Sequence, residues 1–479
     1  MEILNEQLGI YKRTPPRHNK PWSGRMTFRH LQKLQNGWNT YKAEGCPRDK
    51  IQLDRLTTID NKTIFMNGNI AKIKGTLKAS EAVRVADTDD YSIPRFERGI
   101  KTIGSSNNPI AKKLLGDGVP TFIPEQEREI PVFYKNQIVG LEGCPGGGKS
   151  TKCADIIELF SQKYIIFYFT PTHEQINNMA AKLIKKHLNF IIMSDESRLL
   201  ENITQYHTSN KKGYNPLAKN AIPRHAKIIL STTNKPLLKL NRIGPCVTII
   251  DEAGRVSLLE AVTAISELKH LKFLLLAGDT KQLGCHTTHK TRIVSILEHI
   301  RTCTAHLWKV RGQYRFDSIL NYLISIAFYE SEMRSLKLVK SRCALVEIWG
   351  CGHSTDANSC EVEANICATI AKVLSMSGTT VITPYRSQQL ELERANQKSI
   401  TIDTAQGSEF SRVILSIGRA KGRGFLTNKR INVGMSRAKD MLIIVAHVDV
   451  VYDIPVLRTL RRVAALNNCL FPLRLNSDE

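Results

Sequence analysis

A glycine-rich loop that ends in lysine and serine is the segment whose residue types indicate a chemical role most directly. Residues 143–150 read Gly-Cys-Pro-Gly-Gly-Gly-Lys-Ser, after an apolar run at 136–141 that predicts a strand and before a helical pattern at 149–162. Glycines let backbone N–H groups curl around phosphates, lysine adds a mobile cation, and serine offers a hydroxyl to Mg²⁺. A chance match is possible for so short a pattern, but its flanks favour a P-loop. The predicted nucleotide ligands are Gly143, Gly146, Gly148, Lys149, Ser150 and Thr151.

Paired carboxylates end a second apolar run. Asp251 and Glu252 follow Val247-Thr-Ile-Ile, which predicts a buried strand. Behind a P-loop, Asp251 is predicted to hold Mg²⁺ together with Ser150, and Glu252 to activate the attacking water. The alternative is a solvated acidic turn. The second carboxylate favours hydrolysis of a nucleotide over phosphoryl transfer to another substrate.

The overall charge predicts a polyanionic partner. The 479 residues carry a net charge of +24, and 42% of them are hydrophobic, enough to bury real cores. Nucleic acid is favoured over a solvated basic surface, and no apolar run is long enough to insert into a membrane. The eleven cysteines lack any C-x-x-C pair. A zinc site drawn from Cys343, Cys351, His353 and Cys360 is therefore disfavoured, and reduced thiols favour a cytoplasmic location, with a nuclear one not excluded.

The chain divides by pattern into three parts. Residues 1–118 hold a basic arm interleaved with aromatic residues and then short alternating runs, which predict a helix followed by a small β module. Residues 119–293 and 294–479 each alternate strand and helix, which predicts two tandem α/β domains with parallel sheets. Trp22, Phe28 and Trp38 in the first part suit either a strand-guiding role or simple core packing.

Further segments in this order resemble superfamily 1 helicases, in the branch of the nonsense-mediated-decay and nidovirus helicases. The resemblance runs from about residue 119 to about residue 465 and implies two RecA-like domains. After the P-loop, its segments are Phe169-Thr-Pro-Thr-His-Glu-Gln175, Ile228-Ile-Leu-Ser-Thr-Thr233, Asp251-Glu-Ala-Gly254, Leu276-Ala-Gly-Asp-Thr-Lys-Gln-Leu283, Gly312-Gln-Tyr-Arg-Phe316, Glu363-Ala364 with Ile382-Thr-Pro-Tyr-Arg-Ser-Gln388, Asp403-Thr-Ala-Gln-Gly-Ser-Glu409 and Asn432-Val-Gly-Met-Ser-Arg437-Ala438.

The resemblance also implies roles at the nucleotide. Arg315 and Arg437 would be arginine fingers, with surface ion pairs as the ordinary alternative for both. Gln282 would sense the γ-phosphate. The remaining assignments are Tyr314 stacked on the base, Glu409 on the ribose, Gly407 beside the phosphates and Gln126 as the adenine reader.

Contacts to a nucleic-acid strand are implied on the faces away from ATP. Hydroxyls and backbone amides there would grip phosphates and sugars without reading the sequence, although each threonine could equally be a helix cap or a strand residue. The expected strand contacts are Pro171, Thr172, Thr232, Thr233, Thr383, Pro384 and Thr404.

The sequence also departs from the family pattern at several points. Arg255 stands where the family usually has glutamine, and Pro131 interrupts the helix expected after Gln126. The nidovirus zinc domain has no counterpart in the sequence.

The expected activity is that of an ATP- and Mg²⁺-dependent helicase moving 5′→3′ along single-stranded RNA or DNA, with RNA favoured. A remodelling ATPase that strips proteins from RNA shares the same motifs. A nucleotide kinase would not need the later segments, and a non-catalytic RNA scaffold would not need Glu252. Viral origin, a host-cytoplasm location and replication or RNA-decay partners complete the expectation.

Overall fold

Two compact units make up the chain in this computed structural model. The first contains residues 1–142, 149–280 and 284–309, and the second contains 143–148, 281–283 and 310–479. The residues that the structure describes are four short strands before residue 85 and then 108–123, 133, 137–194, 196–208, 226–233, 243–266, 268–285, 294–337, 342–350, 358–374, 378–419, 422, 424 and 426–475.

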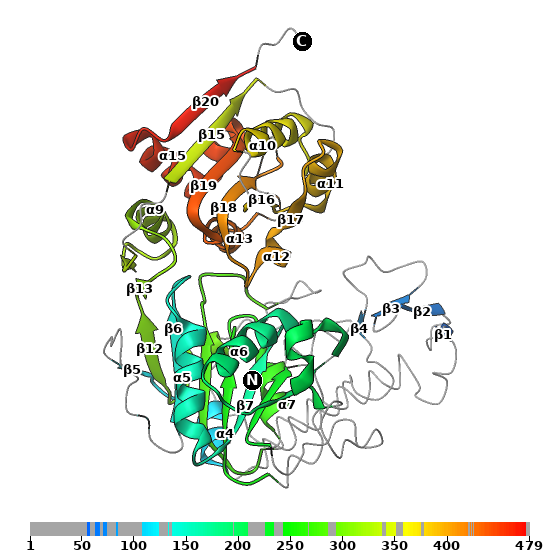
Figure 1. The fold of residues 1–479 in the computed structure, drawn as a ribbon, viewed down its shortest axis with the longest axis vertical. Helices are drawn as coiled ribbons and strands as arrows, with labels where there is room; N and C mark the ends of the chain where they lie inside the picture. The colour runs from blue at the N-terminus through cyan, green and yellow to red at the C-terminus, as the bar shows by residue number, and fades with distance from the viewer. Residues whose placement is uncertain are drawn as a thin grey trace. The chain divides into compact units, whose positions relative to one another are not determined.

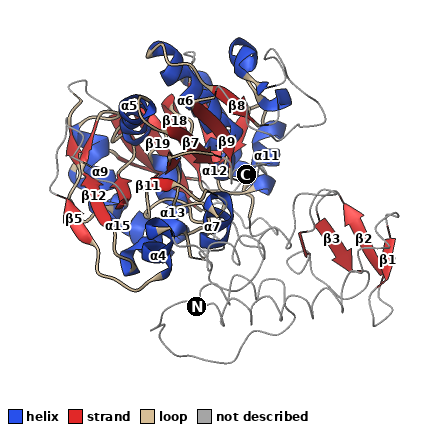
Figure 2. Cartoon of the chain, turned by 90° about the horizontal axis from the view of Figure 1, so that it is seen from below, coloured by secondary structure: helices blue, strands red, loops and turns tan. Residues whose placement is uncertain are grey.

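The four short strands form an antiparallel sheet in sequence order. They are β1 (Arg55–Thr57), β2 (Thr63–Asn67), β3 (Ile70–Ile73) and β4 (Val83–Arg84). Strands β1 to β3 can be followed in Figure 2. This confirms the β part of the expected N-terminal module. The expected helix, with Trp22, Phe28 and Trp38, lies outside the described residues.

The first unit is built on an eight-stranded sheet of order β5-β12-β6-β11-β10-β7-β9-β8. Its strands are β5 (Thr121–Ile123), β6 (Gln137–Gly143), β7 (Ile165–Thr170), β8 (Ile191–Met193), β9 (Ile228–Thr232), β10 (Cys246–Ile250), β11 (Leu271–Gly278) and β12 (His306–Val310). Within the part of the sheet ordered β6-β11-β10-β7-β9-β8, every pair of neighbouring strands is parallel. Strands buried on both faces need continuous apolar runs, and β9 and β10 are buried at every position.

Helices cover this sheet. They are α4 (Pro109–Leu115), α5 (Lys149–Ser161), α6 (His173–Lys185), α7 (Leu258–Ile265) and α8 (Ile296–His299), with 3₁₀ turns η3 (Glu196–Arg198), η4 (Glu201–Tyr206) and η8 (Ile300–Thr302). Helices α5 and α6 pack on β7, β9 and β11, and one apolar core joins α4, α7 and α8 to the sheet (Figure 1). The helices therefore hold the strand ends, where the P-loop and the acidic pair lie, in a rigid layer.

The second unit holds a six-stranded sheet of order β17-β16-β18-β19-β15-β20, in which every pairing is parallel. Its strands are β15 (Arg342–Trp349), β16 (Thr379–Thr383), β17 (Ser399–Thr401), β18 (Phe410–Ser416), β19 (Ala438–His447) and β20 (Leu470–Arg474). A separate two-stranded ribbon joins β13 (Gly312–Gln313) and β14 (Arg334–Ser335).

Two apolar cores lie against the second sheet. One joins it to α9 (Ser318–Phe328), α13 (Asn428–Met435), α14 (Val448–Asp453) and α15 (Pro455–Leu466). The other packs α10 (Glu361–Val373) and α11 (Arg386–Arg394) on the sheet, and α12 (Ile402–Ala405) follows β17. Helices α9 to α13 and α15 are labelled in Figure 1.

The structure confirms the predicted fold class of two α/β units with parallel sheets. Strand β12 belongs to the first sheet, so that sheet continues past residue 293, where the sequence pattern placed the end of the first domain. The predicted domain boundaries remain a proposal. Among the described residues, no helix is both long and apolar enough to cross a membrane.

Candidate nucleotide site

The P-loop connects β6 to α5, as the sequence predicts. Gly146 and Gly148 adopt φ of +74° and +73°, in the left-handed region that favours glycine. A Cβ added to Gly146 would lie 2.5 Å from the Cβ of Arg315, so this position has no room for a side chain. Lys149 and Ser150 form the first turn of α5, whose N-terminal amides suit an anion. The loop therefore presents glycines, a cation and a helix start to one ligand.

Ser150 and Asp251 meet directly across the first unit. The Ser150 hydroxyl donates to Asp251 Oδ2 at 2.8 Å, although 101 residues separate them in the sequence. Asp251 follows β10 and is 2% exposed. A hydroxyl and a carboxylate at this spacing fit Mg²⁺, which binds few protein oxygens and keeps its other positions for phosphates and water. No group of three or more His, Cys, Asp or Glu side chains suited to a metal occurs in the described part of the chain.

Glu252 has an unusual backbone conformation. Its φ is +53°, and its N–H donates to Asp251 Oδ1 at 2.9 Å. A non-glycine residue in this region costs on the order of 1–3 kcal/mol and persists where surrounding contacts impose it. The turn packs on the end of β11, because a Cβ at Gly254 would lie 2.9 Å from the Asp279 carbonyl oxygen. The turn that follows Asp251 is thus fixed by tertiary contacts.

Tyr168 is a site residue that the sequence patterns missed. It lies on β7, and its hydroxyl donates to Asp251 Oδ2 at 2.9 Å. Burial and then the charge of Asp251 raise the pKa of Tyr168 well above its usual value, so the hydroxyl stays protonated as a donor. The only signal in the sequence is one hydroxyl-bearing aromatic within the buried run Ile165-Ile-Phe-Tyr-Phe169.

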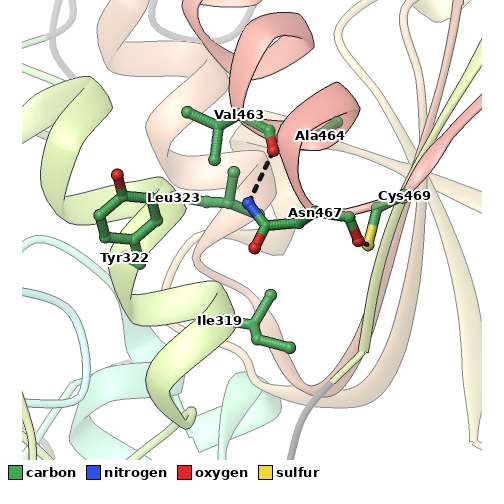
Figure 3. Close-up of a pocket in the computed structure, with 7 residues that line it drawn as sticks. All are labelled: Ile319, Tyr322, Leu323, Val463, Ala464, Asn467 and Cys469. Carbon is green, nitrogen blue, oxygen red and sulfur yellow. Dashed lines mark hydrogen bonds between the residues drawn. The ribbon is translucent and has the colours of Figure 1, made fainter.

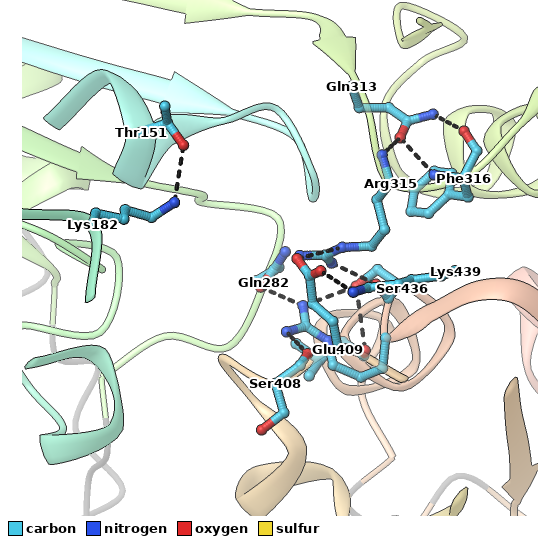
Figure 4. A network of polar contacts seen from close by, with 12 residues as sticks. Thr151, Lys182, Gln282, Gln313, Arg315, Phe316, Ser408, Glu409, Ser436 and Lys439 are labelled. Carbon is cyan, nitrogen blue, oxygen red and sulfur yellow. Dashed lines mark hydrogen bonds and ion pairs between the residues drawn. The ribbon is translucent and has the colours of Figure 1, made fainter. Parts of the chain in front are cut away.

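Arg437 is held inside the second unit by contacts with Ser408 and Gln282, both labelled in Figure 4. It follows α13 and is 3% exposed. Its guanidinium donates to the carbonyl oxygens of Val433 and Ser408 at 3.0 and 3.1 Å. It also donates to Gln282 Oε1 at 3.4 Å. The structure therefore brings together two predicted catalytic residues, and it rejects the alternative of a surface ion pair for Arg437.

Arg315 makes a second cluster in the same unit, also drawn in Figure 4. Its Nε donates to Glu409 Oε1 at 3.0 Å, and its Nη1 donates to the Ser436 carbonyl oxygen at 2.6 Å. Lys439 Nζ lies 3.1 Å from Glu409 Oε2. Burial raises the pKa of Glu409, but Arg315 and Lys439 outweigh burial and hold it at about 2. Gln313 orients Arg315 by accepting its backbone N–H at 2.8 Å.

The other predicted nucleotide ligands differ in exposure. Tyr314 is 52% exposed, with its N–H donating to the Gly146 carbonyl oxygen at 3.0 Å, so its ring is available for stacking. Gly407 has φ of +95°. Thr151 is exposed and accepts a hydrogen bond from Lys182 at 3.1 Å. Gln126 and Pro131 lie outside the described residues.

The predicted strand contacts follow the carboxyl ends of parallel strands within each unit. Pro171 and Thr172 follow β7, and Thr232 and Thr233 lie at the end of β9. Thr383 and Pro384 lie at the end of β16, and Thr404 is in α12. Thr404 is exposed and Thr172 is half-buried. Thr233 and Thr383 are 3% and 0% exposed, so their hydroxyls have almost no surface to offer a ligand, and strand binding by this set stays a prediction.

A small pocket in the second unit lies apart from these residues (Figure 3). It is lined by residues of α9 and α15 and of the segment after α15, namely Ile319, Tyr322, Leu323, Val463, Ala464, Asn467 and Cys469. No predicted site residue lines it, and it contains no cation for a phosphate. The pocket is therefore not part of the candidate nucleotide site.

Comparison with known proteins finds similar sequences among ATP-dependent helicases. A family model described as an AAA domain matches residues 293–449. The DNA replication ATP-dependent helicase/nuclease JHS1 of Arabidopsis thaliana is 25% identical over 432 residues, which cover 78% of this chain and 31% of that protein. The ATP-dependent helicase NAM7 of Saccharomyces cerevisiae is 23% identical, with 64% of this chain and 40% of that protein covered. The chain is similar to superfamily 1 helicases, in agreement with the resemblance that its motifs carry.

The chain spans less than half the length of these curated relatives. The Replicase polyprotein 1ab of Murine coronavirus is 21% identical over 351 residues, which cover 67% of this chain and 5% of the polyprotein. Among solved structures, an Arterivirus nonstructural protein 10 (helicase) with DNA aligns with 80% of the chain and 71% of its own length, at 18% identity and a TM-score of 0.43.

Proposed function

We propose that the chain hydrolyses ATP and uses the hydrolysis to move along single-stranded nucleic acid. The observation that carries the proposal is the hydrogen bond between Ser150 and Asp251, directly behind a glycine loop shaped for phosphates. Ser150 lies in the first turn of a helix, Asp251 is a buried carboxylate, and the adjacent Glu252 has a φ of +53°. This combination supports nucleotide hydrolysis over simple binding.

Each residue has a role in this proposal. Lys149 neutralises phosphate charge, and the Glu252 carboxylate accepts a proton from the attacking water. Mg²⁺, when held by Ser150 and Asp251, supplies positive charge to the phosphate oxygens. By the resemblance, Arg315 and Arg437 would supply further positive charge, and hydrogen bonds to carbonyl oxygens hold both guanidiniums in place.

The strand and the direction of movement are further parts of the proposal. We infer single-stranded RNA and 5′→3′ movement from the resemblance, with the net charge of +24 supporting a polyanion of either kind. The remodelling ATPase remains the second candidate, because it would use the same nucleotide residues. A duplex with a single-stranded 5′ or 3′ tail, in RNA and DNA versions, separates these possibilities by which tail supports unwinding.

The direct test compares Lys149→Ala with the intact protein. We expect the variant to lose ATP hydrolysis while it still binds a single-stranded oligonucleotide, because the basic surface is unchanged. Lys163→Ala is the matched control, since Lys163 is an exposed lysine after the same helix. Phosphate release and fluorescence anisotropy measure the two properties. Normal hydrolysis by Lys149→Ala contradicts the proposed nucleotide site.

A further inference from the structure

Glu142 is a charged residue to which neither the motifs nor the proposed mechanism assigns a role. It is in β6, directly before the P-loop, and its side chain is 16% exposed. Its Oε1 accepts a hydrogen bond from the Thr280 hydroxyl, and its Oε2 pairs with the Arg301 guanidinium. Thr280 follows β11, which pairs with β6, and Arg301 is in η8. One carboxylate thus connects three segments that are distant in sequence.

Glu142 and Thr280 each stand directly before a short segment that belongs to the second unit. Glu142 is the last residue of the first unit before the loop 143–148, and Thr280 is the last before 281–283. The first loop contains the phosphate-binding glycines. The second contains Gln282, whose Oε1 accepts a hydrogen bond from Arg437. The Glu142–Thr280 contact therefore joins the starting points of two loops that carry nucleotide-site residues.

The chemistry of the contact requires a carboxylate. Both of its oxygens accept from donors, and one donor is a cation, so each bond is charge-assisted and stronger than a bond between neutral groups. Glutamine in this place could still accept from Thr280, but its NH₂ group would then face the Arg301 guanidinium. Arg301 is 47% exposed, so its contribution is orientation of the carboxylate more than net stability.

We propose that Glu142 is a positioning residue that fixes the spacing between the P-loop and the Gln282 loop during ATP hydrolysis. This inference rests on the proposed function, because an effect of Glu142 on turnover requires that the chain hydrolyses ATP. A loss of the contact would leave both loops attached to their strands but free to shift against each other. Misplacement of a positioned group by a small distance reduces turnover strongly, even where the ligand still binds.

The test compares steady-state ATP hydrolysis by Glu142→Ala, Thr280→Val and the double variant. We expect each single variant to lower kcat about tenfold, the effect of losing one charge-assisted hydrogen bond, with KM for ATP changed by less than about threefold. The kcat of the double variant should be no lower than that of either single variant, because the two substitutions remove the same contact. Thr280→Ser should keep the kcat of the intact protein. The kcat of Glu142→Gln should lie between those of the intact protein and Glu142→Ala.

Hydrogen–deuterium exchange gives a readout that does not depend on hydrolysis. Glu142→Ala should increase exchange in both 143–148 and 281–283, whereas the control Glu391→Ala, which removes a carboxylate paired with the exposed Arg394, should not. Unchanged exchange in either loop, additive losses in the double variant, or a change in KM alone overturns the inference. If the intact protein hydrolyses no ATP, the proposed function fails, and the exchange result still decides the role of Glu142.

Discussion

At the scale of single residues, the two predicted arginine fingers differ in how they are held. The guanidinium of Arg437 is buried and donates to backbone carbonyls, whereas that of Arg315 shares Glu409 with Lys439. A buried guanidinium fixed by carbonyls keeps its position and its charge, which is the property that a charge-stabilising group needs. Substitution of Arg437 is therefore the clearer test of the arginine-finger role.

We predict that Arg437→Ala lowers kcat for ATP hydrolysis by about 10³-fold, the lower range for an arginine finger, while affinity for ATP changes little. The effect arises because the lost charge acts mainly on the transition state. Steady-state kinetics and binding of a fluorescent ATP analogue measure the two quantities. Arg394→Ala, at a 73% exposed side chain, is the control. An unchanged kcat would remove Arg437 from the active site.

A second prediction at this scale concerns Tyr168. We expect Tyr168→Phe to lower kcat about tenfold, because Asp251 Oδ2 loses the Tyr168 hydroxyl as a donor and keeps that of Ser150. The apolar ring still fills its buried place, so the unfolding temperature should change little. The Mg²⁺ concentration that gives half-maximal hydrolysis should shift as well. Kinetics indistinguishable from those of the intact protein would show that Tyr168 only packs.

At the scale of elements, a buried carboxyl joins helix α10 to the end of strand β18. Glu363 is 0% exposed, and its Oε1 accepts from the Ser416 hydroxyl at 2.6 Å and the Gly418 N–H at 2.8 Å. Its Oε2 is buried without a hydrogen-bond partner. Burial, and then the nearby Cys360 thiol, raise the pKa of Glu363 to about 8. The helix is therefore held to the sheet by a carboxyl that keeps its proton.

This raised pKa predicts a pH-dependent stability. Below the ordinary glutamate pKa of 4.5, both folded and unfolded chains carry the proton, and its stabilising effect is complete. Between 4.5 and about 8, only the unfolded chain loses the proton, so stability falls as pH rises. Relative to Glu363→Gln, the intact protein should lose on the order of 3 kcal/mol in unfolding free energy over this range.

Urea unfolding at pH 5 and pH 8 checks this expectation. Glu363→Gln retains an oxygen that accepts from Ser416 and Gly418, so the variant should fold, and its stability should vary less with pH. Glu361→Gln is the control, because Glu361 is an exposed glutamate on the same helix. Equal pH dependence in the intact protein and Glu363→Gln would show that this carboxyl does not control the effect.

At the scale of the whole molecule, the dominant property is the net charge of +24. A protein that neutralises several phosphates releases their counterions, so its affinity falls linearly with salt on logarithmic scales. We predict a loss of about 300-fold or more in affinity for a single strand between 50 and 200 mM salt, given at least six phosphate contacts. Anisotropy titrations at several salt concentrations measure the slope. A flat response would leave the charge without a nucleic-acid role.

The order of neighbouring residues in the sequence was enough to predict the P-loop, the acidic pair and two α/β units with parallel sheets. Each of these depends on neighbouring residues, because a loop cradles phosphates through consecutive amides and a buried strand needs a continuous apolar run. The ordered motifs also supplied Gln282, Arg315 and Arg437. The structure shows Arg437 donating a hydrogen bond to Gln282 at 3.4 Å, while the roles of both residues at the nucleotide stay predictions.

Only the tertiary structure decided which distant side chains meet. Tyr168 and Asp251 are 83 residues apart, Arg315 and Glu409 are 94 apart, and Glu142 and Thr280 are 138 apart. Strand order in the sheet sets these pairs, and neither periodicity nor composition encodes that order. Burial of Thr383 and Glu363 was equally hidden, because the sequence pattern marks a polar residue at a strand end or helix start without showing what covers it.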